Sequence, residues 1–284
     1  MLSYRHAFHA GNHADVLKHA VEALILTQLC SKEKPFCYID THAGGGCYDL
    51  RGDWAQKKAE YVDGIARLWA DRAPWQAIDA YLQTIARLNP GQQLDFYPGS
   101  PEVARQLSRP QDKLMLMELH NQEIDILREH MAGDPRVAVH HRDGFEGLPA
   151  LLPPTPRRGL VLIDPPYELK EDYQRVVQTL RKAMRRWPTG IYALWYPILG
   201  QAQDRSRDML QAFRQDESFP SLLVAELEVA AQSADWGMHG SGMLILNAPW
   251  QLDNQLQSLL PALCRTLSQD AHARSRIEWL RQPA

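Results

Sequence analysis

The sequence has few cysteines, no long apolar run and no internal repeat, and each absence excludes a class of protein. Its four cysteines form no CxxC pair, so neither a disulfide framework nor an oxidising compartment is expected. The longest apolar stretches, such as residues 21–29, contain polar side chains and fall far short of a membrane span. The N-terminus is polar where a signal peptide needs an apolar core. We therefore expect a cytoplasmic protein with no membrane segment.

A large excess of charge of one sign is also absent. The 284 residues include 31 Lys and Arg against 34 Asp and Glu, which gives a formal net charge of −3, and 45% of them are hydrophobic. This composition is typical of a globular protein and excludes disordered, collagen-like and coiled-coil chains. The length fits one large domain, or one domain with an insertion. The slightly acidic balance gives no general attraction to nucleic acids, so composition alone ranks nucleic-acid binding low.

The average charge hides local contrast. Residues 171–190 carry five basic and two acidic side chains, and residues 265–284 carry four and two. Residues 204–230 carry three basic and six acidic side chains. Because of these basic strips, the average charge does not exclude a selective nucleic-acid-binding protein whose affinity is modest and salt-sensitive.

Short apolar runs that end at polar residues, glycine or proline predict strands. Five runs stand out and two more follow them: residues 36–40, 113–118, 137–140, 160–164 and 191–196, then 222–229 and 243–247. Helical patterns lie between several of them, over residues 12–30, 101–107, 122–131, 171–187 and 203–213. Alternating helices and nearly continuous apolar strands predict an α/β fold whose parallel sheet is covered on both faces.

One spacing in this pattern is too long. The distance from Asp40 to Glu118 is 78 residues, whereas a strand-helix-strand step takes about 30. The excess contains two helical patterns, over residues 55–70 and 74–88. We expect a small helical subdomain at residues 48–97, inserted into a main domain formed by residues 1–47 and 98–284.

Acidic residues follow four of the predicted strands: Asp40, Glu118, Asp143 and Asp164. Ligands of an open parallel sheet bind outside the carboxyl ends of its strands. A single acid at such a place can equally well have a structural role, in which it ends the strand and caps the next helix. Four in order, with a glycine turn at residues 44–46 after the first, favour a binding site, because glycines let backbone N–H groups approach a ligand.

These positions suit a cofactor that contains adenosine. Glu118 can bind two ribose hydroxyls, and Asp143-Gly144 can reach the amine of an adenine. A nucleoside-triphosphate loop is not expected, because the sequence has no GxxxxGK[ST] motif. Position 49 is Asp where the third glycine of a dinucleotide motif would stand.

The segment Asp164-Pro165-Pro166-Tyr167 is the most specific feature of the sequence. It directly follows an apolar strand. Because prolines have no N–H and fix φ, this segment exposes carbonyl groups in a rigid array. A carboxylate and a fixed carbonyl can accept both hydrogens of an exocyclic amine on a base and so localise its lone pair, while Tyr167 offers a ring for the base to stack on. The alternative is a simple strand-ending proline turn.

Four histidines, His6, His9, His13 and His19, lie close together near the N-terminus. A zinc site is not favoured, because no cysteine is near and only His9 and His13 share one helical face. We expect no metal. We expect instead an N-terminal arm that folds over the ligands, with Asn12 beginning the helix that follows.

These motifs resemble those of a known family. The acid-ended strands, the glycine turn and the DPPY segment are similar to class I methyltransferases, which use S-adenosylmethionine. The N-terminal run at residues 1–6, together with the segments at residues 8–19, 40–44, 97–100, 163–167 and 193–197, resembles the RlmJ family of bacterial 23S rRNA adenine-N6 methyltransferases. The resemblance extends over essentially the whole chain. It implies a Rossmann-like sheet that is mostly parallel with a final antiparallel strand, and a single target, adenine 2030 of 23S rRNA.

The resemblance also implies roles for individual residues. Asp164 is the implied catalytic residue. The implied cofactor-binding residues are Lys18, His19, His42, Ser100, Glu118, Asp143, Gly144 and Asp164. The implied substrate-binding residues are Tyr4, His6, Pro165, Pro166 and Tyr167.

The implied reaction is direct in-line transfer of a methyl group to N6 of a flipped-out adenine. Its partner is 23S rRNA, either naked or in an early assembly particle, and we expect a monomer because one base needs one site. Two alternatives remain open. One is methylation of DNA adenines by the same site, and the other is a cofactor-binding ribosome-assembly factor without catalysis.

Overall fold

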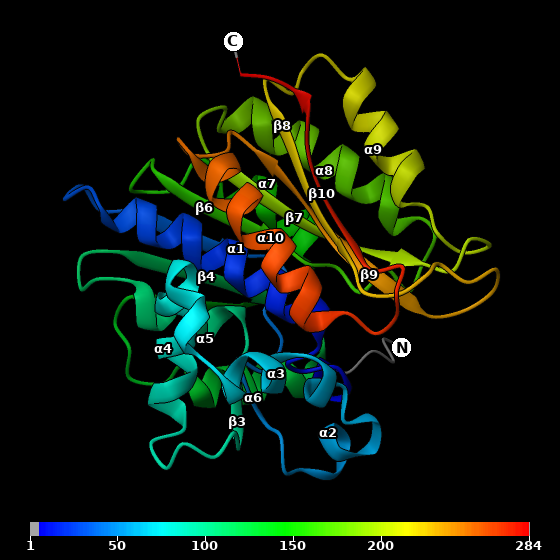
Figure 1. Ribbon diagram of the computed structural model, residues 1–284. Coiled ribbons are helices and arrows are strands. Elements are labelled where there is room, and N and C mark those ends of the chain that lie inside the picture. The colour runs from blue at the N-terminus through cyan, green and yellow to red at the C-terminus, as the bar shows by residue number, and fades with distance from the viewer. Residues whose placement is uncertain (1–5, 284) are drawn as a thin grey trace.

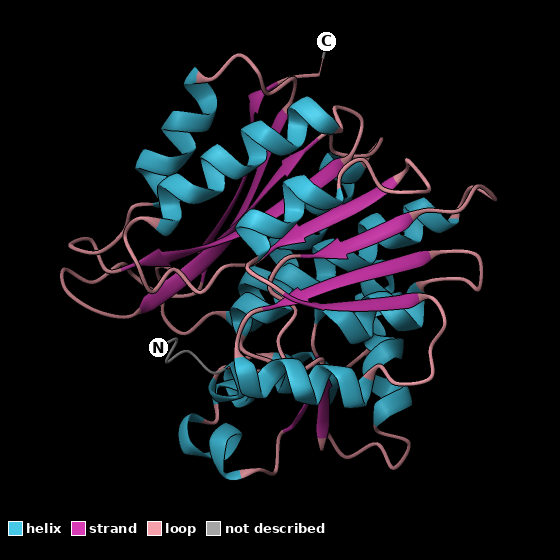
Figure 2. Ribbon diagram, turned by 180° about the vertical axis from the view of Figure 1, so that it is seen from behind, coloured by secondary structure: helices cyan, strands magenta, loops and turns pink. Residues whose placement is uncertain are grey.

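The apolar runs of the sequence form one eight-stranded sheet with helices on both faces (Figures 1 and 2). We describe it from a computed structural model that covers residues 6–283. The strands are β1 (Cys37–Asp40), β4 (Lys113–Glu118), β5 (Val137–His141), β6 (Gly159–Ile163), β7 (Ile191–Leu199), β8 (Leu222–Glu228), β9 (Met238–Leu246) and β10 (Arg274–Arg281). All seven predicted strands are present, and β10 is additional.

The strand order of the sheet is β5-β4-β1-β6-β7-β9-β8, with β10 added beside β8. Strands β5, β4, β1, β6 and β7 are parallel to their neighbours. Strand β9 runs antiparallel to both β7 and β8, and it contains the last of the predicted strands. The expected fold class, mostly parallel with a final antiparallel strand, is therefore confirmed.

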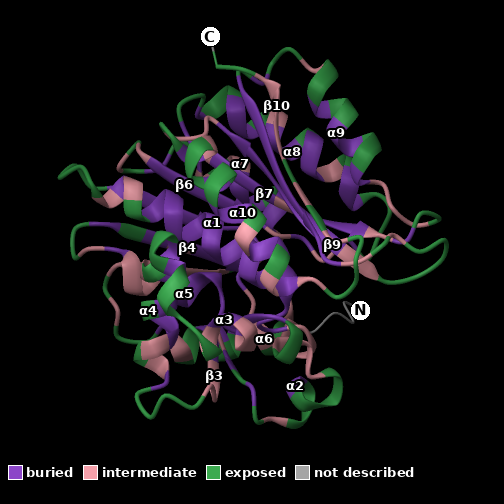
Figure 3. Ribbon diagram, in the orientation of Figure 1, coloured by how far each residue is buried: buried purple, intermediate pink, exposed green. Residues whose placement is uncertain are grey.

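Two hydrophobic cores lie on the two faces of the sheet. Successive side chains of a strand point to opposite faces, so Tyr38 belongs to one core and its neighbour Ile39 to the other. The first core packs α1 (His13–Cys30), α4 (Asp79–Leu88), α5 (Ser100–Leu107), α6 (Asn121–His130) and α10 (Leu252–Leu267). The second packs α7 (Gly144–Leu151), α8 (Asp172–Arg186) and α9 (Ser206–Gln215). Figure 3 shows that α1 and the central strands are the most deeply buried elements.

The insertion begins and ends at a two-stranded antiparallel ribbon, β2 (Cys47–Asp49) and β3 (Phe96–Pro98). Between them lie α2 (Asp53–Lys58), η2 (Glu60–Asp63), α3 (Ile65–Ala70), η3 (Ala73–Ile78) and α4. The single helix predicted over residues 55–70 is wrong, because the chain breaks at Ala59, whose φ is 49°, and at Gly64. A Cβ on Gly64 would lie 2.1 Å from the carbonyl oxygen of Gly11. The break therefore lets the insertion approach the N-terminal segment.

The insertion does not have a separate core. Its buried residues Ile65, Tyr81 and Ile85 belong to the same cluster as Val16 and Leu17 of α1. The four cysteines are free. Over residues 6–283, no helix is long and apolar enough to cross a membrane.

Candidate active site

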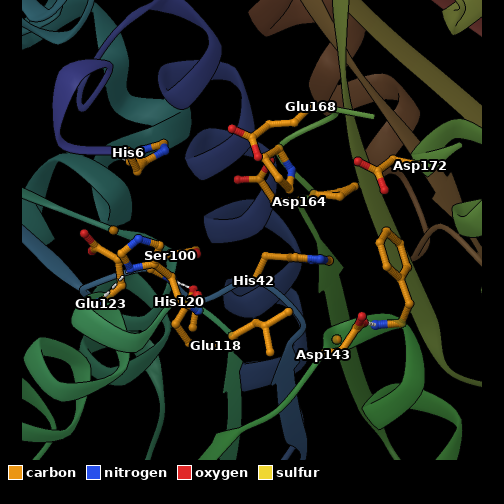
Figure 4. A pocket seen from close by; sticks show the side chains of 18 of the residues that line it. His6, His42, Ser100, Glu118, His120, Glu123, Asp143, Asp164, Glu168 and Asp172 are labelled. Atoms are coloured by element: carbon orange, nitrogen blue, oxygen red, sulfur yellow. Dashed lines mark hydrogen bonds between the residues drawn. The ribbon is translucent and has the colours of Figure 1, made fainter. Parts of the chain in front are cut away.

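A pocket of about 310 Å³ lies where β1, β4, β5 and β6 end. Figure 4 shows Asp164 and Glu168 in the upper part of the view, with Glu118 and Asp143 in the lower part. Eleven of the thirteen predicted site residues line this pocket: His6, Lys18, His19, His42, Ser100, Glu118, Asp143, Gly144, Asp164, Pro165 and Pro166. The parallel sheet explains the convergence, because the carboxyl ends of its strands meet at one edge.

Two predicted residues remain, Tyr4 and Tyr167. Tyr4 lies outside the described residues. The structure does not bring Tyr167 to the pocket with the other predicted residues, because its side chain is 8% exposed and turned into the core. Its hydroxyl donates to the carbonyl oxygen of Trp195 at 2.9 Å, and its ring packs on Tyr173 at 4.5 Å between centroids. The positive φ of Tyr167, 49°, accompanies this turn.

The glycine turn after β1 holds the carboxylate of Glu118. The N–H of Gly44 donates to one oxygen at 2.8 Å, and the N–H of His120 donates to the other at 2.6 Å. A Cβ on Gly44 would lie 2.4 Å from the hydroxyl of Tyr48, and its φ is +60°, so glycine is required there. An ionised carboxylate has about four acceptor sites, so Glu118 retains capacity to accept hydroxyl donors from a ligand in the pocket.

Asp143 is fixed at the beginning of α7. It accepts from the N–H of Phe145 at 2.8 Å and from the guanidinium of Arg175 at 2.8 Å. Burial opposes ionisation, but these hydrogen bonds outweigh it and lower the pKa of Asp143. Arg175 also lies over the ring of Phe145, with Cζ 4.3 Å from the centroid. A Cβ on Gly144 would lie 2.1 Å from the carbonyl oxygen of Thr41, so the chain approaches this closely only with glycine.

Asp40, the first of the strand-end acids, lies beneath the pocket and does not line it. It is fully buried and accepts from the hydroxyls of Tyr38 at 2.8 Å and Ser100 at 2.7 Å. The N–H of His42 donates to its other oxygen at 3.1 Å. Burial raises the pKa of Asp40 to about 6 despite these bonds. Asp40 is thus a support that positions Ser100 and His42.

His19, which lines the pocket, contains a buried polar atom without a partner among the described residues. Its Nδ1 is 2.7 Å from the hydroxyl of Tyr97, which lies 2.8 Å from that of Tyr81. Its Nε2 has no hydrogen-bond partner among the described residues. Burial lowers the pKa of His19 well below its usual value, so the ring is neutral. A buried nitrogen without a partner is costly, and a polar ligand in the pocket would satisfy it.

A buried chain of charges supports Asp164. The ammonium of Lys18 is 2.5 Å from Asp164 Oδ2 and 2.9 Å from Asp15 Oδ1. The other oxygen of Asp15 lies 2.9 Å from His6 Nε2 and accepts from the N–H of Gly11 at 2.9 Å. Burial opposes the charge of Lys18, but the two carboxylates outweigh it and hold its pKa well above the usual value. Lys18 therefore remains a cation and fixes one oxygen of Asp164.

The N-terminal histidines have partners other than metal. His6 contacts Asp15, and His9 Nδ1 lies 2.9 Å from Glu60 Oε2. Within the described part of the chain, no group of three or more His, Cys, Asp or Glu side chains is arranged to hold a metal ion. Asn12 begins α1 as predicted, since its side chain accepts from the N–H groups of Ala14 and Asp15 at 3.0 Å.

His13 makes a pH-dependent contribution to stability. Burial lowers its pKa from 6.5 to about 4, against the attraction of Glu60 and Asp15. Between these two pH values the unfolded chain binds a proton that the folded chain does not. The stability of the wild type relative to a His13→Gln variant is therefore constant above pH 6.5 and falls by about 3 kcal/mol as the pH drops to 4. Urea unfolding of both proteins from pH 7.5 to 4 measures this difference, and the exposed His272→Gln change is the control.

Sequence reasoning missed several residues that line the pocket: Tyr48, His120, Glu123, Phe145, Glu168, Leu169, Asp172 and Arg175. His120 could have been predicted from the sequence, because it directly precedes a helical pattern and lies two residues after Glu118. In the structure it is the N-cap of α6. Arg175 could not have been predicted from the sequence, since its partner Asp143 is 32 residues away and only the packing of α7 on α8 brings them together.

Together, the sheet order and the acidic pocket at the carboxyl ends of its strands define a class I methyltransferase, whose cofactor is S-adenosylmethionine. The residues present fit that cofactor. Two carboxylates, Glu118 and Asp143, line it, glycines admit a ligand near the backbone, and the lining residue His19 has a buried Nε2 without a partner among the described residues.

Comparisons with known proteins give the family. Residues 33–281 match the model of the family described as ribosomal RNA large subunit methyltransferase D, RlmJ. Two proteins named ribosomal RNA large subunit methyltransferase J are similar over 99% of both chains, one from Escherichia coli at 46% identity and one from Haemophilus influenzae at 45%. The crystal structure of a protein from Legionella pneumophila is 35% identical, with a TM-score of 0.87 over 95% of this chain and 98% of that one. The chain belongs to the RlmJ family of methyltransferases, and the predicted family is confirmed.

Proposed function

We propose that this protein methylates N6 of a single adenine, adenine 2030, in 23S rRNA, by direct transfer to a flipped-out base. The observation that carries this proposal is the carboxylate of Asp164 in the pocket, held by Lys18 and followed by two prolines. An adenine inside a helix cannot reach such a pocket, so the base must leave its stack. On this proposal the enzyme acts in the cytoplasm as a monomer.

The walls of the pocket divide into a cofactor part and a substrate part. S-adenosylmethionine, when bound, supplies an electrophilic methyl group. Glu118 would accept from its ribose hydroxyls, and Asp143 with the N-terminus of α7 would bind its adenine end. His19, His42 and Ser100 line the same space. The pKa of His42 is lowered by burial, so it stays neutral and does not repel a cationic cofactor.

Asp164 and Pro165 orient the target amine. Lys18 occupies Asp164 Oδ2, whereas Oδ1 has no hydrogen-bond partner in the described part of the chain. We assign Oδ1 to accept one N6–H, and the carbonyl of Pro165 to accept the other. Because Pro165 and Pro166 have no N–H, this segment offers the amine acceptors only. The two bonds localise the nitrogen lone pair, and the main catalytic gain is the attack geometry. The nitrogen becomes acidic once alkylated, and its proton then passes to Asp164 or to water.

The direct test is mass spectrometry of RNA after reaction with S-adenosylmethionine. Protein-free 23S rRNA, an early large-subunit particle and duplex DNA are compared as methyl acceptors. We expect N6-methyladenine at position 2030 in an RNA substrate and none in DNA. Transfer to DNA alone would support the DNA alternative. Binding of cofactor and RNA without transfer would support an assembly factor, and either result would contradict the proposal.

Glu118→Ala tests the cofactor part of the pocket. The change removes a carboxylate that accepts from Gly44 and His120 and faces the ribose position. Hydrogen bonds to charged groups contribute roughly 1.5–3 kcal/mol, so the dissociation constant for S-adenosylmethionine is expected to rise about 10- to 100-fold. Calorimetric titration measures it. Glu129→Ala, at an exposed position of α6, is the control, and equal affinities of the two variants would contradict the assignment.

A further inference from the structure

A second pocket, of about 430 Å³, lies between α8 and α9. The two helices lie side by side in both views (Figures 1 and 2). It is lined by Lys170, Tyr173, Gln174, Val177, Gln178, Arg181, Arg205, Asp208, Met209 and Ala212, and we call it the α8–α9 groove. The groove begins beside the mouth of the active site, because Lys170 directly follows Leu169, which lines the first pocket.

The charge of the α8–α9 groove is positive. Three of its lining residues, Lys170, Arg181 and Arg205, are basic, and Asp208 is its one acid. Arg181 is paired with Asp216 at 2.7 Å. Over residues 6–283, Lys170 and Arg205 form no ion pair. Two cations beside the active-site mouth are therefore available to an anionic ligand.

Tyr173 supplies an independent observation. Its side chain is 6% exposed and lines the groove, but its hydroxyl has no hydrogen-bond partner in the described part of the chain. A buried hydroxyl without a partner is costly, and burial raises its pKa, so it remains a donor. Its ring packs on Tyr167, the residue that follows the two prolines of the target-binding segment. The groove thus offers one buried O–H donor and two cations, the groups that bind phosphate oxygens.

We propose that the α8–α9 groove binds the sugar-phosphate backbone of the RNA strand next to the target adenine. This rests on the proposed function, because a base flipped into the first pocket brings its neighbouring phosphates to the mouth where Lys170 lies. Lys170 and Arg205 neutralise these phosphates, and the hydroxyl of Tyr173 donates to a phosphate oxygen. Contacts of this kind position the strand and read no sequence.

The salt dependence of RNA binding tests the two cations. Binding of a 23S rRNA fragment that contains adenine 2030 is measured between about 50 and 200 mM salt, the range over which phosphate contacts change affinity steeply. The variants are Lys170→Gln, Arg205→Gln and the double change. Each lost contact should reduce the slope of log K against log salt by about 0.7–0.9, with affinity about tenfold lower in the double variant. Lys32→Gln and Lys113→Gln, exposed and on other elements, are matched controls and should keep the wild-type slope.

Tyr173→Phe tests the hydroxyl. The ring and its packing on Tyr167 are retained, so the thermal midpoint should be unchanged or higher because an unsatisfied buried group is removed. RNA affinity should fall several-fold, with the affinity for S-adenosylmethionine unchanged. A merely structural role would lower the thermal midpoint and leave RNA affinity of the folded protein unaltered, and that result would overturn the assignment.

The two proposals fail in distinguishable ways. A wild type that methylates no adenine in any RNA acceptor overturns the proposed function. The wild type could methylate adenine 2030 while the groove variants show the same salt slope and affinity as the two controls. That result overturns only the proposal that the α8–α9 groove binds RNA.

Discussion

Replacing Asp164 with alanine is expected to reduce the rate of methyl transfer by about 10³-fold or more, an effect typical of losing a group that orients or accepts a proton from the reacting atom. The variant lacks the acceptor for one N6–H, so the nitrogen lone pair is no longer directed at the methyl group. Affinity for S-adenosylmethionine should be largely retained, because Glu118 and Asp143 lie in the other part of the pocket. Single-turnover rates and calorimetric cofactor titrations separate the two effects.

Glu171→Ala is the matched control for this experiment. Glu171 is an acid seven residues further along the chain, it is exposed, and its side chain makes no capping bond to α8. It should retain wild-type rates. An Asp164→Ala protein with full activity would exclude Asp164 from the reaction, and one that no longer binds cofactor would show that its main role is to hold the cofactor.

The strands were predictable because each has a continuous apolar run, whereas the missed elements lack such a signal. In β10, Arg274 and Arg276 alternate with other residues and point to Glu228 and Glu226 at 2.8 and 2.7 Å. The arginines that interrupt the apolar pattern of β10, and so prevent its recognition in the sequence, are thus the residues that form ion pairs with β8. Helices α7 and α10 were missed because each contains an internal proline, which breaks a helical pattern.

The site residues that directly follow a strand could be predicted from the sequence. The side chains whose direction depends on tertiary packing could not. Glu118 and Asp164 lie at strand ends, and the parallel sheet brings both to one pocket. Tyr167 follows Asp164 closely, but its positive φ and the rings of Tyr173 and Trp195 turn it away from the pocket. Proximity in sequence to a site residue therefore did not determine where this side chain points.

Lys18→Met is expected to have the largest effect on stability. Lys18 lies between two carboxylates, those of Asp15 and Asp164, and the side chains of Lys18 and Asp15 are 5% and 2% exposed. Removing one partner of a buried ion pair leaves an uncompensated buried charge, which costs about 3–5 kcal/mol. Methyl transfer should fall at least about 100-fold, because Asp164 loses the cation that fixes one of its oxygens. Urea unfolding at pH 7 and single-turnover rates measure the two effects.

The pH dependence of the stability lost in Lys18→Met identifies the cause of that loss. Burial opposes the ionisation of Asp15, but His6 and Lys18 outweigh it and hold the pKa of Asp15 well below its usual value. Such a carboxylate contributes stability that is present above its unfolded pKa and is lost as the pH falls through the folded one. The difference between wild type and Lys18→Met should therefore be largest near pH 7 and shrink in acid. A difference that does not change with pH would indicate lost packing instead.

Adding Asp15→Asn to Lys18→Met separates stability from chemistry. The double variant removes the buried charge that Lys18→Met deprives of its ammonium partner and leaves to His6 and the N–H of Gly11, so it should recover much of the lost stability, and it keeps an acceptor for that N–H. It should not recover methyl transfer, because Asp164 Oδ2 still lacks its cation. Recovery of both properties would mean that Lys18 acts only through the fold. Recovery of stability alone would show that the same ammonium group both satisfies a buried carboxylate and positions the one that meets the substrate.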